Sequence, residues 1–426
     1  METRFIPNRA ALDLQQSAYE LSEGTASAPN DENTLAGTQQ PEAAPGADEP
    51  PRARILAFTC RPQPVADIGE NRNAVLFQQQ RSTIPQNKAI HRRISATPER
   101  VLDAPQMTDD YYLNLLDWNQ HNILAVALGN AVYLWNATTG DNDKLVELPE
   151  GQLITSVSWC PRHKSNIIAV GTSGKDVQLW DADRKMQMRN LRGHEDRVAS
   201  LAWNGSIVSA GSRDTSIINF DVRLPDPRIA TMSGFHQQEV CSLRWSPDGT
   251  QLASGGNDNQ LFIWDSMQLH QPLHSLMGHQ GAVKAMAWCP LQPNLLASGG
   301  GSADRTIKIW NTSSAACLNS IDTESQVCSL LWSKYDMELL SSHGFRHNQL
   351  CLWSYPSMVK FAELRGHEKR VLHLAMSPDG TTVCSGSPDE SLRFWKVFRG
   401  ANDVAKGAPA EGGEATGRGL QTLQLR

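Results

Sequence analysis

Four histidine–aspartate pairs recur along this chain of 426 residues, and such pairs are used in acid–base and metal chemistry. Each aspartate stands six residues before an aromatic residue, and the histidine of the pair lies 20 to 25 residues upstream of the aspartate. A pair that repeats four times in register indicates structure rather than catalysis, because buried polar groups can satisfy each other's hydrogen bonds. The pairs are His194 with Asp214, His236 with Asp258, His279 with Asp304, and His367 with Asp389.

The tryptophans indicate the elements that hold these pairs. All twelve lie between Trp118 and Trp395, in two interleaved series with steps of 40 to 46 residues. Phe220 and Met376 occupy the positions where a tryptophan is missing, so each series has seven members and the chain has seven repeats. The first series is Trp118, Trp159, Trp203, Trp245, Trp288, Trp332 and Met376, and the second is Trp135, Trp180, Phe220, Trp264, Trp310, Trp353 and Trp395. The first, second and sixth repeats lack both members of the histidine–aspartate pair. This agrees with a structural role, because the loss of one member alone would leave the other buried without a hydrogen-bond partner.

Each repeat contains apolar runs of period two separated by tight polar turns, which predicts strands. In the fifth repeat these runs cover residues 282–288, 295–300 and 306–310. A repeat of this length, with Gly-His near its start and Trp-Asp near its end, is typical of the WD-type β-propeller with four strands in each blade. We therefore predict an all-β fold, a seven-bladed WD-repeat β-propeller with disordered N- and C-terminal tails.

The domain boundaries follow from the extent of the two tryptophan series and from the composition of the segments that flank them. The propeller is predicted over residues 94–400, with tails at 1–93 and 401–426. Residues 1–50 hold nine acidic and two basic residues, whereas residues 51–100 hold nine basic and three acidic residues. Neither segment has enough aromatic or β-branched residues to form a core, and residues 400–419 are rich in glycine and alanine.

Composition also limits the compartment and the partners. Eight scattered cysteines without a Cys-x-x-Cys motif predict buried thiols in a reducing compartment. A net charge of −6 argues against bulk binding of nucleic acid, and no apolar run predicts a membrane span or a signal peptide. We expect a protein of the nucleus and cytoplasm. The basic run Arg81–Arg93 is open to two interpretations, an import signal or a solvated linker.

Three short motifs outside the ladder resemble those of a known family. Residues 3–9, Thr-Arg-Phe-Ile-Pro-Asn-Arg, resemble the C-box of the Fizzy-type coactivators of the anaphase-promoting complex. Residues 54–58, Arg-Ile-Leu-Ala-Phe, resemble their Lys/Arg-Ile-Leu box, and the terminal Leu425-Arg426 resembles their Ile-Arg tail. Residues 100–105, 109–118, 238–241, 254–259 and 325–328 of the propeller are also similar to that family. The Arg-Ile-Leu-Ala-Phe box favours the mitotic Fizzy branch over the Fizzy-related branch.

The resemblance implies that the tails dock a ligase. We expect the C-box arginines to pair with acidic groups, Phe5 and Ile6 to fill apolar pockets, and the terminal carboxylate of Arg426 to enter a polar pocket. Thr3 replaces an acidic residue and Leu425 an isoleucine of the family motifs, and both changes are expected to weaken docking. The implied docking residues are Arg4, Phe5, Ile6, Pro7, Arg9, Arg54, Ile55, Leu56, Leu425 and Arg426.

The resemblance further implies two sites for degrons, the short motifs that mark substrates. The destruction box, Arg-x-x-Leu, is expected to place its arginine between Asp103 and Glu390 at the closing seam, with Leu102 against its leucine. In the Lys-Glu-Asn site, Asp110 is expected to bind the lysine and Arg370 the glutamate. The alternative for the asparagines of this site is that they only form turns. The implied Lys-Glu-Asn residues are Asp110, Asn257, Asn259, Ser302, Gln326 and Arg370.

The function implied is that of a non-catalytic substrate adaptor and activator of the anaphase-promoting ubiquitin ligase. The expected partners are ligase subunits, degron-bearing substrates such as mitotic cyclins and securin, and spindle-checkpoint proteins, with no nucleic acid and no membrane. Three alternatives stay open: a coactivator of the Fizzy-related branch, a propeller scaffold of another complex, and a propeller enzyme with catalytic groups in its central channel.

Other motifs give weaker evidence for a functional site. His343 and His347 have metal-like spacing, but no carboxylate or thiol completes a ligand set, so neither a metal nor a cofactor is expected. The Ser246-Pro247 and Ser377-Pro378 dipeptides are predicted to form hairpin turns, which leaves Thr97-Pro98 as the candidate for proline-directed phosphorylation. The sequence contains no Gly-x-Ser-x-Gly, Walker or dinucleotide motif.

Overall fold

The computed structural model describes residues 92, 94–161, 166–401 and 403. The docking motifs predicted at residues 3–9, 54–58 and 425–426 lie outside these residues, as does most of the basic run 81–93. Among the described residues, no helix is long and apolar enough to cross a bilayer.

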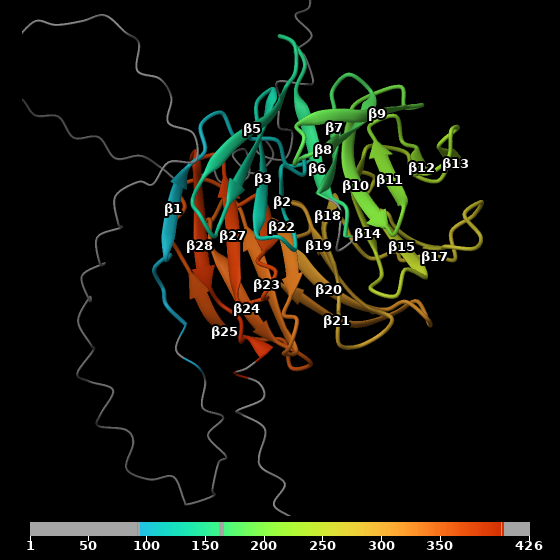
Figure 1. Cartoon of the computed structure of the whole chain (residues 1–426). Helices are drawn as coiled ribbons and strands as arrows, with labels where there is room; N and C mark the ends of the chain where they lie inside the picture. Colours follow the sequence, from blue (N-terminus) through green and yellow to red (C-terminus); the bar gives the residue numbers. More distant parts are fainter. Residues whose placement is uncertain (1–91, 93, 162–165, 402, 404–426) are drawn as a thin grey trace, which may run out of the picture.

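The described residues form seven four-stranded antiparallel sheets, which are the blades of a propeller (Figure 1). The seven blades confirm the predicted fold class. Blades 1 to 3 contain β2 (Leu116–Trp118), β3 (Ile123–Leu128), β4 (Ala131–Asn136) and β5 (Asn142–Glu147); β6 (Ile154–Trp159), β7 (Ile167–Thr172), β8 (Asp176–Asp181) and β9 (Met186–Arg192); and β10 (Val198–Asn204), β11 (Ile207–Ser212), β12 (Ile217–Asp221) and β13 (Arg228–Met232).

Blades 4 to 6 follow the same order, from the channel outwards. They contain β14 (Val240–Trp245), β15 (Gln251–Gly256), β16 (Leu261–Asp265) and β17 (His274–Ser275); β18 (Val283–Trp288), β19 (Leu295–Gly300), β20 (Thr306–Asn311) and β21 (Ala316–Asp322); and β22 (Val327–Trp332), β23 (Glu338–His343), β24 (Leu350–Ser354) and β25 (Val359–Leu364). Blade 7 combines β26 (His373–Met376), β27 (Thr382–Ser387) and β28 (Ser391–Lys396) with β1 (Arg100–Asp103) as its outer strand.

The tryptophan ladder maps onto two strands of every blade. First-series positions lie at or next to the end of the innermost strand, and second-series positions lie in the third strand. The second series contributes the most deeply buried rings, since Trp135, Trp264 and Trp395 are at most 1% exposed. Burial of such a ring removes a large apolar surface from water, so the ladder forms the core of each blade.

The four predicted histidine–aspartate pairs are all formed, and in blades 4, 5 and 7 they extend through a serine to the tryptophan of the third strand. In blade 7, His367 Nδ1 donates to Asp389 at 2.8 Å and its Nε2 accepts from Ser385 Oγ at 2.7 Å. Trp395 Nε1 in turn donates to Ser385 Oγ at 2.9 Å. Burial raises the pKa of Asp389, but its hydrogen bonds from His367 and Ser391 outweigh this effect and lower the pKa to about 2. The structural assignment of these histidines is therefore confirmed.

Two blades vary this chain of hydrogen bonds. Blade 3 has Ala210 at the position of the serine and Phe220 at the position of the tryptophan, and the Nε2 of His194 has no hydrogen-bond partner among the described residues. Blade 6 lacks the usual pair but places His343 two residues after Ser341 on the same strand, and its Nε2 lies 2.7 Å from Ser341 Oγ. His343 is thus a buried core residue that replaces the missing histidine, and this replacement was not predicted.

The ring closes through the N-terminal strand. Arg100 to Asp103 pair antiparallel with Phe394 to Ser391, so β1 lies beside β28 (Figure 1). Arg92 also contacts the propeller, because its guanidinium donates to Glu338 at 2.6 Å and its Nε donates to the Val397 carbonyl at 3.0 Å. The chain therefore enters and leaves the propeller at neighbouring points, although Arg92 lies before the predicted boundary at residue 94.

Most of the described cysteines are buried and both Ser-Pro dipeptides form turns, as the sequence predicted. Six of the seven described cysteines are buried and Cys317 is exposed, and all seven are free thiols. Ser246 Oγ donates to Asp248 at 2.5 Å and Ser377 makes the matching contact with Asp379, so both serines form hairpin turns. Thr97, by contrast, is exposed.

Candidate functional site

The segment 109–114, which precedes blade 1, crosses one end of the central channel. Tyr111 is 1% exposed there, and its hydroxyl donates to the Val327 carbonyl of blade 6 at 3.0 Å. Asn114 Nδ2 donates to the carbonyls of Ala199 in blade 3 and Cys241 in blade 4, at 2.8 and 2.9 Å. β-bulges in the innermost strands of blades 2 to 6 interrupt the pairing between strands near these carbonyls. The segment therefore closes the channel and joins blades that are distant in sequence.

Lys284 supports this closure from within the channel. Its Nζ donates to the Leu372 carbonyl at 3.0 Å and lies 5.4 Å from the centre of the Tyr111 ring. The side chain belongs to a residue only 4% exposed, and burial lowers its pKa to about 8.

Asp110 lies at the rim of the closed end, as predicted, but its carboxylate already has a partner. Arg197 Nη1 donates to Asp110 at 2.7 Å, and the same guanidinium donates two hydrogen bonds of 2.8 Å to Glu239. Burial works against the charge of Arg197, yet its hydrogen bonds to the carboxylates of Glu239 and Asp110 outweigh this effect and raise the pKa of Arg197. Asp110, Arg197 and Glu239 therefore form one ionic cluster across blades 3 and 4.

Arg370 lies on the same rim and is 3% exposed. Its Nε donates to the Asp109 carboxylate at 2.8 Å, and its guanidinium lies 4.9 Å from the centre of the Phe345 ring. Gln326 is close by, because both side chains approach Gly344. Adjacent residues Asp109 and Asp110 thus hold two different arginines, and the rim presents acidic and basic groups side by side.

The asparagines of the predicted site differ in their surroundings. Asn257 accepts a hydrogen bond from the Tyr112 hydroxyl at 2.9 Å and donates to Gln238 at 2.7 Å. Asn259 has a φ of 65°, a left-handed conformation that asparagine adopts more readily than most residues, so it also forms the turn. Asn257 is thereby tied to the channel-closing segment. Ser302 lies half-buried in the corresponding turn of blade 5.

The closing seam brings the other predicted acids together. Asp103 pairs with Ser391 in the β1–β28 ladder, and the Ala104 amide donates to the Glu390 carbonyl at 2.7 Å. The Glu390 side chain is exposed and accepts from the Gln106 amide at 3.3 Å. Both carboxylates therefore flank the same edge of the propeller.

The structure places Leu102, which was expected to contact the degron leucine at this seam, in the core of the propeller. Leu102 is 0% exposed and belongs to the core cluster that includes Leu392 and Phe394. Successive side chains of a strand point to opposite faces, so Asp103 faces outwards only because Leu102 faces inwards.

A separate pocket of about 340 Å³ lies between blades 1 and 7, at the Arg100 end of β1. Its lining includes Arg100, Trp118, Trp135 and Phe394. An apolar side chain would find aromatic surface there, at the end of β1 opposite to Asp103.

The sequence analysis missed several rim residues that the fold brings into contact with the predicted ones. The sequence contained a signal for two of them, Arg197 and Glu239. Like the predicted residues Gln326 and Arg370, each stands immediately before a valine at the start of an innermost strand or just before it. Equal positions in a propeller repeat lie on the same face and face the same axis. The missed residues are Asp109, Tyr112, Arg197, Gln238, Glu239 and Phe345.

The rim has the composition of a peptide-binding surface. Carboxylates and guanidiniums with fixed positions bind oppositely charged side chains, and amides bind amides. Within the described part of the chain, no group of three or more histidine, cysteine or acidic residues is placed to hold a metal ion.

Comparison with known proteins now supplies the family. The model of the CDC20/Fizzy WD40 domain matches residues 102–395. The chain is 51% identical over 427 residues to "Cell division cycle 20.1, cofactor of APC complex" of Arabidopsis thaliana, covering 95% of this chain and 89% of that protein. It is 52% identical to "Anaphase-promoting complex subunit cdc20" of Dictyostelium discoideum, covering 83% and 72%.

Fizzy-related proteins match over a shorter region. "Protein FIZZY-RELATED 1" of Arabidopsis thaliana is 50% identical over 307 residues, covering 72% of this chain and 64% of that protein. Among solved structures, a chain of the "Crystal Structure of Mitotic Checkpoint Complex" superposes with a TM-score of 0.70 at 44% identity, covering 75% of this chain and 98% of that chain. The domain match, the extent of the relatives and this structural likeness place the present chain in the CDC20/Fizzy family of WD40 propeller proteins.

Proposed function

We propose that this protein is a substrate-recognition adaptor and activator of the anaphase-promoting ubiquitin ligase, with its propeller as the receptor for degrons. Relatives that match most of the chain are named as cofactors or subunits of that complex. The structural observation that carries the proposal is the rim of the closed channel end, where Asp110 and Arg370 lie among ordered charged partners.

The rim suits a Lys-Glu-Asn motif, which has a cation and an anion next to each other. The degron lysine binds at Asp110 and the glutamate at Arg370, while Asn257 and Asn259 bind the asparagine amide. The internal partners Arg197 and Asp109 hold the two charged groups in place before the peptide arrives, which reduces the ordering cost of binding.

The closing seam suits the destruction box. Its arginine binds between Asp103 and Glu390, both of which flank the seam. An extended peptide covers about 10 Å in three residues, and β1 runs three residues from Asp103 to Arg100. A destruction box that runs alongside β1 therefore brings its leucine to the pocket lined by Trp118 and Phe394.

The tails complete the adaptor. Because Arg92 contacts the Val397 carbonyl, the two segments that carry the docking motifs join the propeller at neighbouring points. Tethered weak motifs bind strongly together, because the second contact is intramolecular once the first is made. Chemistry is supplied by the ligase and not by this chain, and the partners are ligase subunits, degron-bearing substrates such as mitotic cyclins and securin, and spindle-checkpoint proteins. Function in the nucleus and cytoplasm belongs to the same proposal.

Fluorescence-labelled peptides test the degron sites on the full-length protein. Asp103→Ala should weaken a destruction-box peptide and leave a Lys-Glu-Asn peptide unchanged, and Arg370→Ala should do the reverse, so each variant is the control for the other. Equal binding of both peptides by both variants would refute the two sites. Deletion of residues 1–9, or of Arg426, should reduce binding to the purified ligase while peptide binding persists. Unchanged ligase binding would refute the adaptor function.

A further inference from the structure

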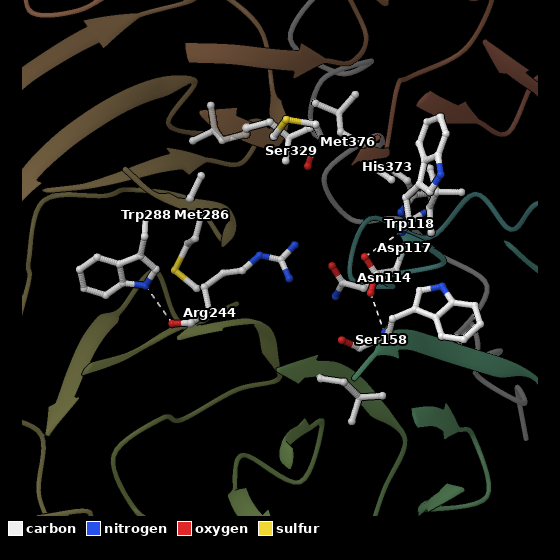
Figure 2. Close-up of a pocket in the computed structure, with 18 of the residues that line it drawn as sticks. Asn114, Asp117, Trp118, Ser158, Arg244, Met286, Trp288, Ser329, His373 and Met376 are labelled. Atoms are coloured by element: carbon white, nitrogen blue, oxygen red, sulfur yellow. Dashed lines mark hydrogen bonds between the residues drawn. The ribbon is translucent and has the colours of Figure 1, made fainter. Parts of the chain in front are cut away.

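The other end of the channel is a cavity of about 510 Å³, called here the chamber. It is lined by the innermost strands of all seven blades and closed by the segment that carries Asn114 (Figure 2). Most of the first-series tryptophans line it, including Trp118, Trp159, Trp288 and Trp332. Its volume lies in the range of small-molecule sites, and its walls combine indole rings with a few polar groups.

Arg244 is the principal charged group of the chamber. It comes from β14, and Figure 2 shows its guanidinium extending into the cavity towards the side where Asn114 and Asp117 lie. The side chain makes no hydrogen bond or ion pair with another residue of the described part of the chain, and only its backbone carbonyl is used, by Trp288 Nε1 at 2.9 Å. The residue is exposed to the solvent of the cavity, so the five N–H donors of its guanidinium are available to a ligand.

Asp117, the acidic residue of the chamber, does not accept hydrogen bonds from Arg244. Its two carboxylate oxygens accept from the backbone amides of Trp118 at 2.9 Å and Trp159 at 2.7 Å. Burial raises the pKa of Asp117 to about 6 despite these bonds and the charge of Arg244. The acid is thus fixed to the wall, and Arg244 keeps its donors directed at the cavity.

The other lining groups favour an anion as well. Lys284 and Lys334 add two cations, each held by backbone carbonyls, so the chamber has more positive than negative charge. His373 is 4% exposed, lines the chamber, and its Nε2 has no hydrogen-bond partner among the described residues. Burial lowers its pKa, so this ring is neutral and offers one further polar contact.

We propose that the chamber binds a small organic anion, in which a carboxylate or phosphate group contacts Arg244 and an aromatic or apolar body packs against the surrounding indole rings and Met286. The site is independent of the degron-binding rim, because the segment 109–114 separates the two ends of the channel. It rests on no part of the proposed function.

The test uses four probes with the full-length protein, measured by calorimetry and ligand-observed NMR. Phenyl phosphate and benzoate carry the two anionic groups on one aromatic body, benzyl alcohol is the neutral control, and inorganic phosphate lacks the body. We expect saturable binding of at least one aromatic anion, with tighter binding than either control, and the better of the two identifies the anionic group.

Variants then locate the binding. Arg244→Gln should weaken the aromatic anion at least tenfold, whereas Arg184→Gln, which removes an arginine with a 76% exposed side chain on the outer surface, should leave it unchanged. Ser329→Met, which fills part of the chamber without touching Arg244, should also weaken it and serves if Arg244→Gln does not fold. Binding of a Lys-Glu-Asn peptide should be the same in all three.

Three outcomes would overturn the proposal. The first is no saturable binding of either aromatic anion at millimolar concentration. The second is equal affinity of the aromatic anion for the wild type, Arg244→Gln and Ser329→Met. The third is binding of benzyl alcohol or inorganic phosphate as tight as that of the anions, which would contradict the required combination of charge and apolar body.

Discussion

Arg370 offers the sharpest test of the degron-binding rim. We expect Arg370→Gln in the protein and Glu→Gln in a Lys-Glu-Asn peptide to be coupled, because both remove the same contact. A hydrogen bond to a charged group contributes about 1.5–3 kcal/mol. Arg370 already donates to Asp109 at 2.8 Å, so a degron glutamate shares a guanidinium that is partly neutralised. We therefore expect the lower end of the range, a coupling of about 1.5 kcal/mol, which corresponds to roughly tenfold in affinity.

The assay is a double-mutant cycle by fluorescence polarisation, with two proteins and two peptides. Wild-type protein should bind the Lys-Glu-Asn peptide about ten times more tightly than the Lys-Gln-Asn peptide, and Arg370→Gln should bind both nearly equally. A destruction-box peptide controls for folding, since its site at Asp103 is separate. A coupling below about 0.3 kcal/mol, with folding intact, would mean that the guanidinium stays with Asp109 and that the degron glutamate binds elsewhere.

Three further predictions concern stability. Arg197→Met leaves Glu239 buried without its partner and should destabilise the propeller by about 3–5 kcal/mol, whereas the double variant Arg197→Met/Glu239→Leu should recover most of that loss in urea unfolding; an additive double variant would contradict the ionic cluster. Burial lowers the pKa of His343 to about 4, so below pH 6.5 the unfolded chain binds the proton first and the stability contributed by neutral His343 is lost as the pH falls. The stability advantage of the wild type over His343→Asn should thus shrink by about 2 kcal/mol between pH 7 and 4.5, and a constant difference would refute this; the raised pKa of Asp117 acts in the opposite direction in both proteins and cancels in the comparison. Arg92→Ala should accelerate proteolysis of the N-terminal segment without changing the midpoint of urea unfolding by more than a small amount, and unchanged proteolysis would show that the contact with Val397 does not hold the chain.

Much of the fold followed from periodicity. Residues at equal positions of a repeat meet equal environments, so the ladder of tryptophans, the four histidine–aspartate pairs and the seven blades all followed from spacing. The exception is instructive: His343 replaces the histidine of blade 6 from a different position on its own strand, and a search by spacing cannot find it.

The candidate site was predictable only in part. Asp103 and Glu390 were expected at one seam because ring closure joins the first and last blades, and the structure places them there. Leu102 was assigned to the same seam, although the alternation of a strand directs it to the opposite face from Asp103. Because alternation is a local property of a strand, the burial of Leu102 was predictable from the sequence alone.

The sequence by itself determined the blade count, the strand periods and the positions at which polar residues approach the channel, because these depend on local spacing that repeats along the chain. Only the tertiary structure decided which charges meet: Asp110 with Arg197, 87 residues apart, and Asp109 with Arg370, 261 residues apart. It also decided that Arg244 faces the chamber without a protein partner among the described residues. The physical reason is that a repeat fixes the direction of each side chain relative to its own blade. The partner across the channel depends on how seven blades close and on the one segment, 109–114, that belongs to no repeat.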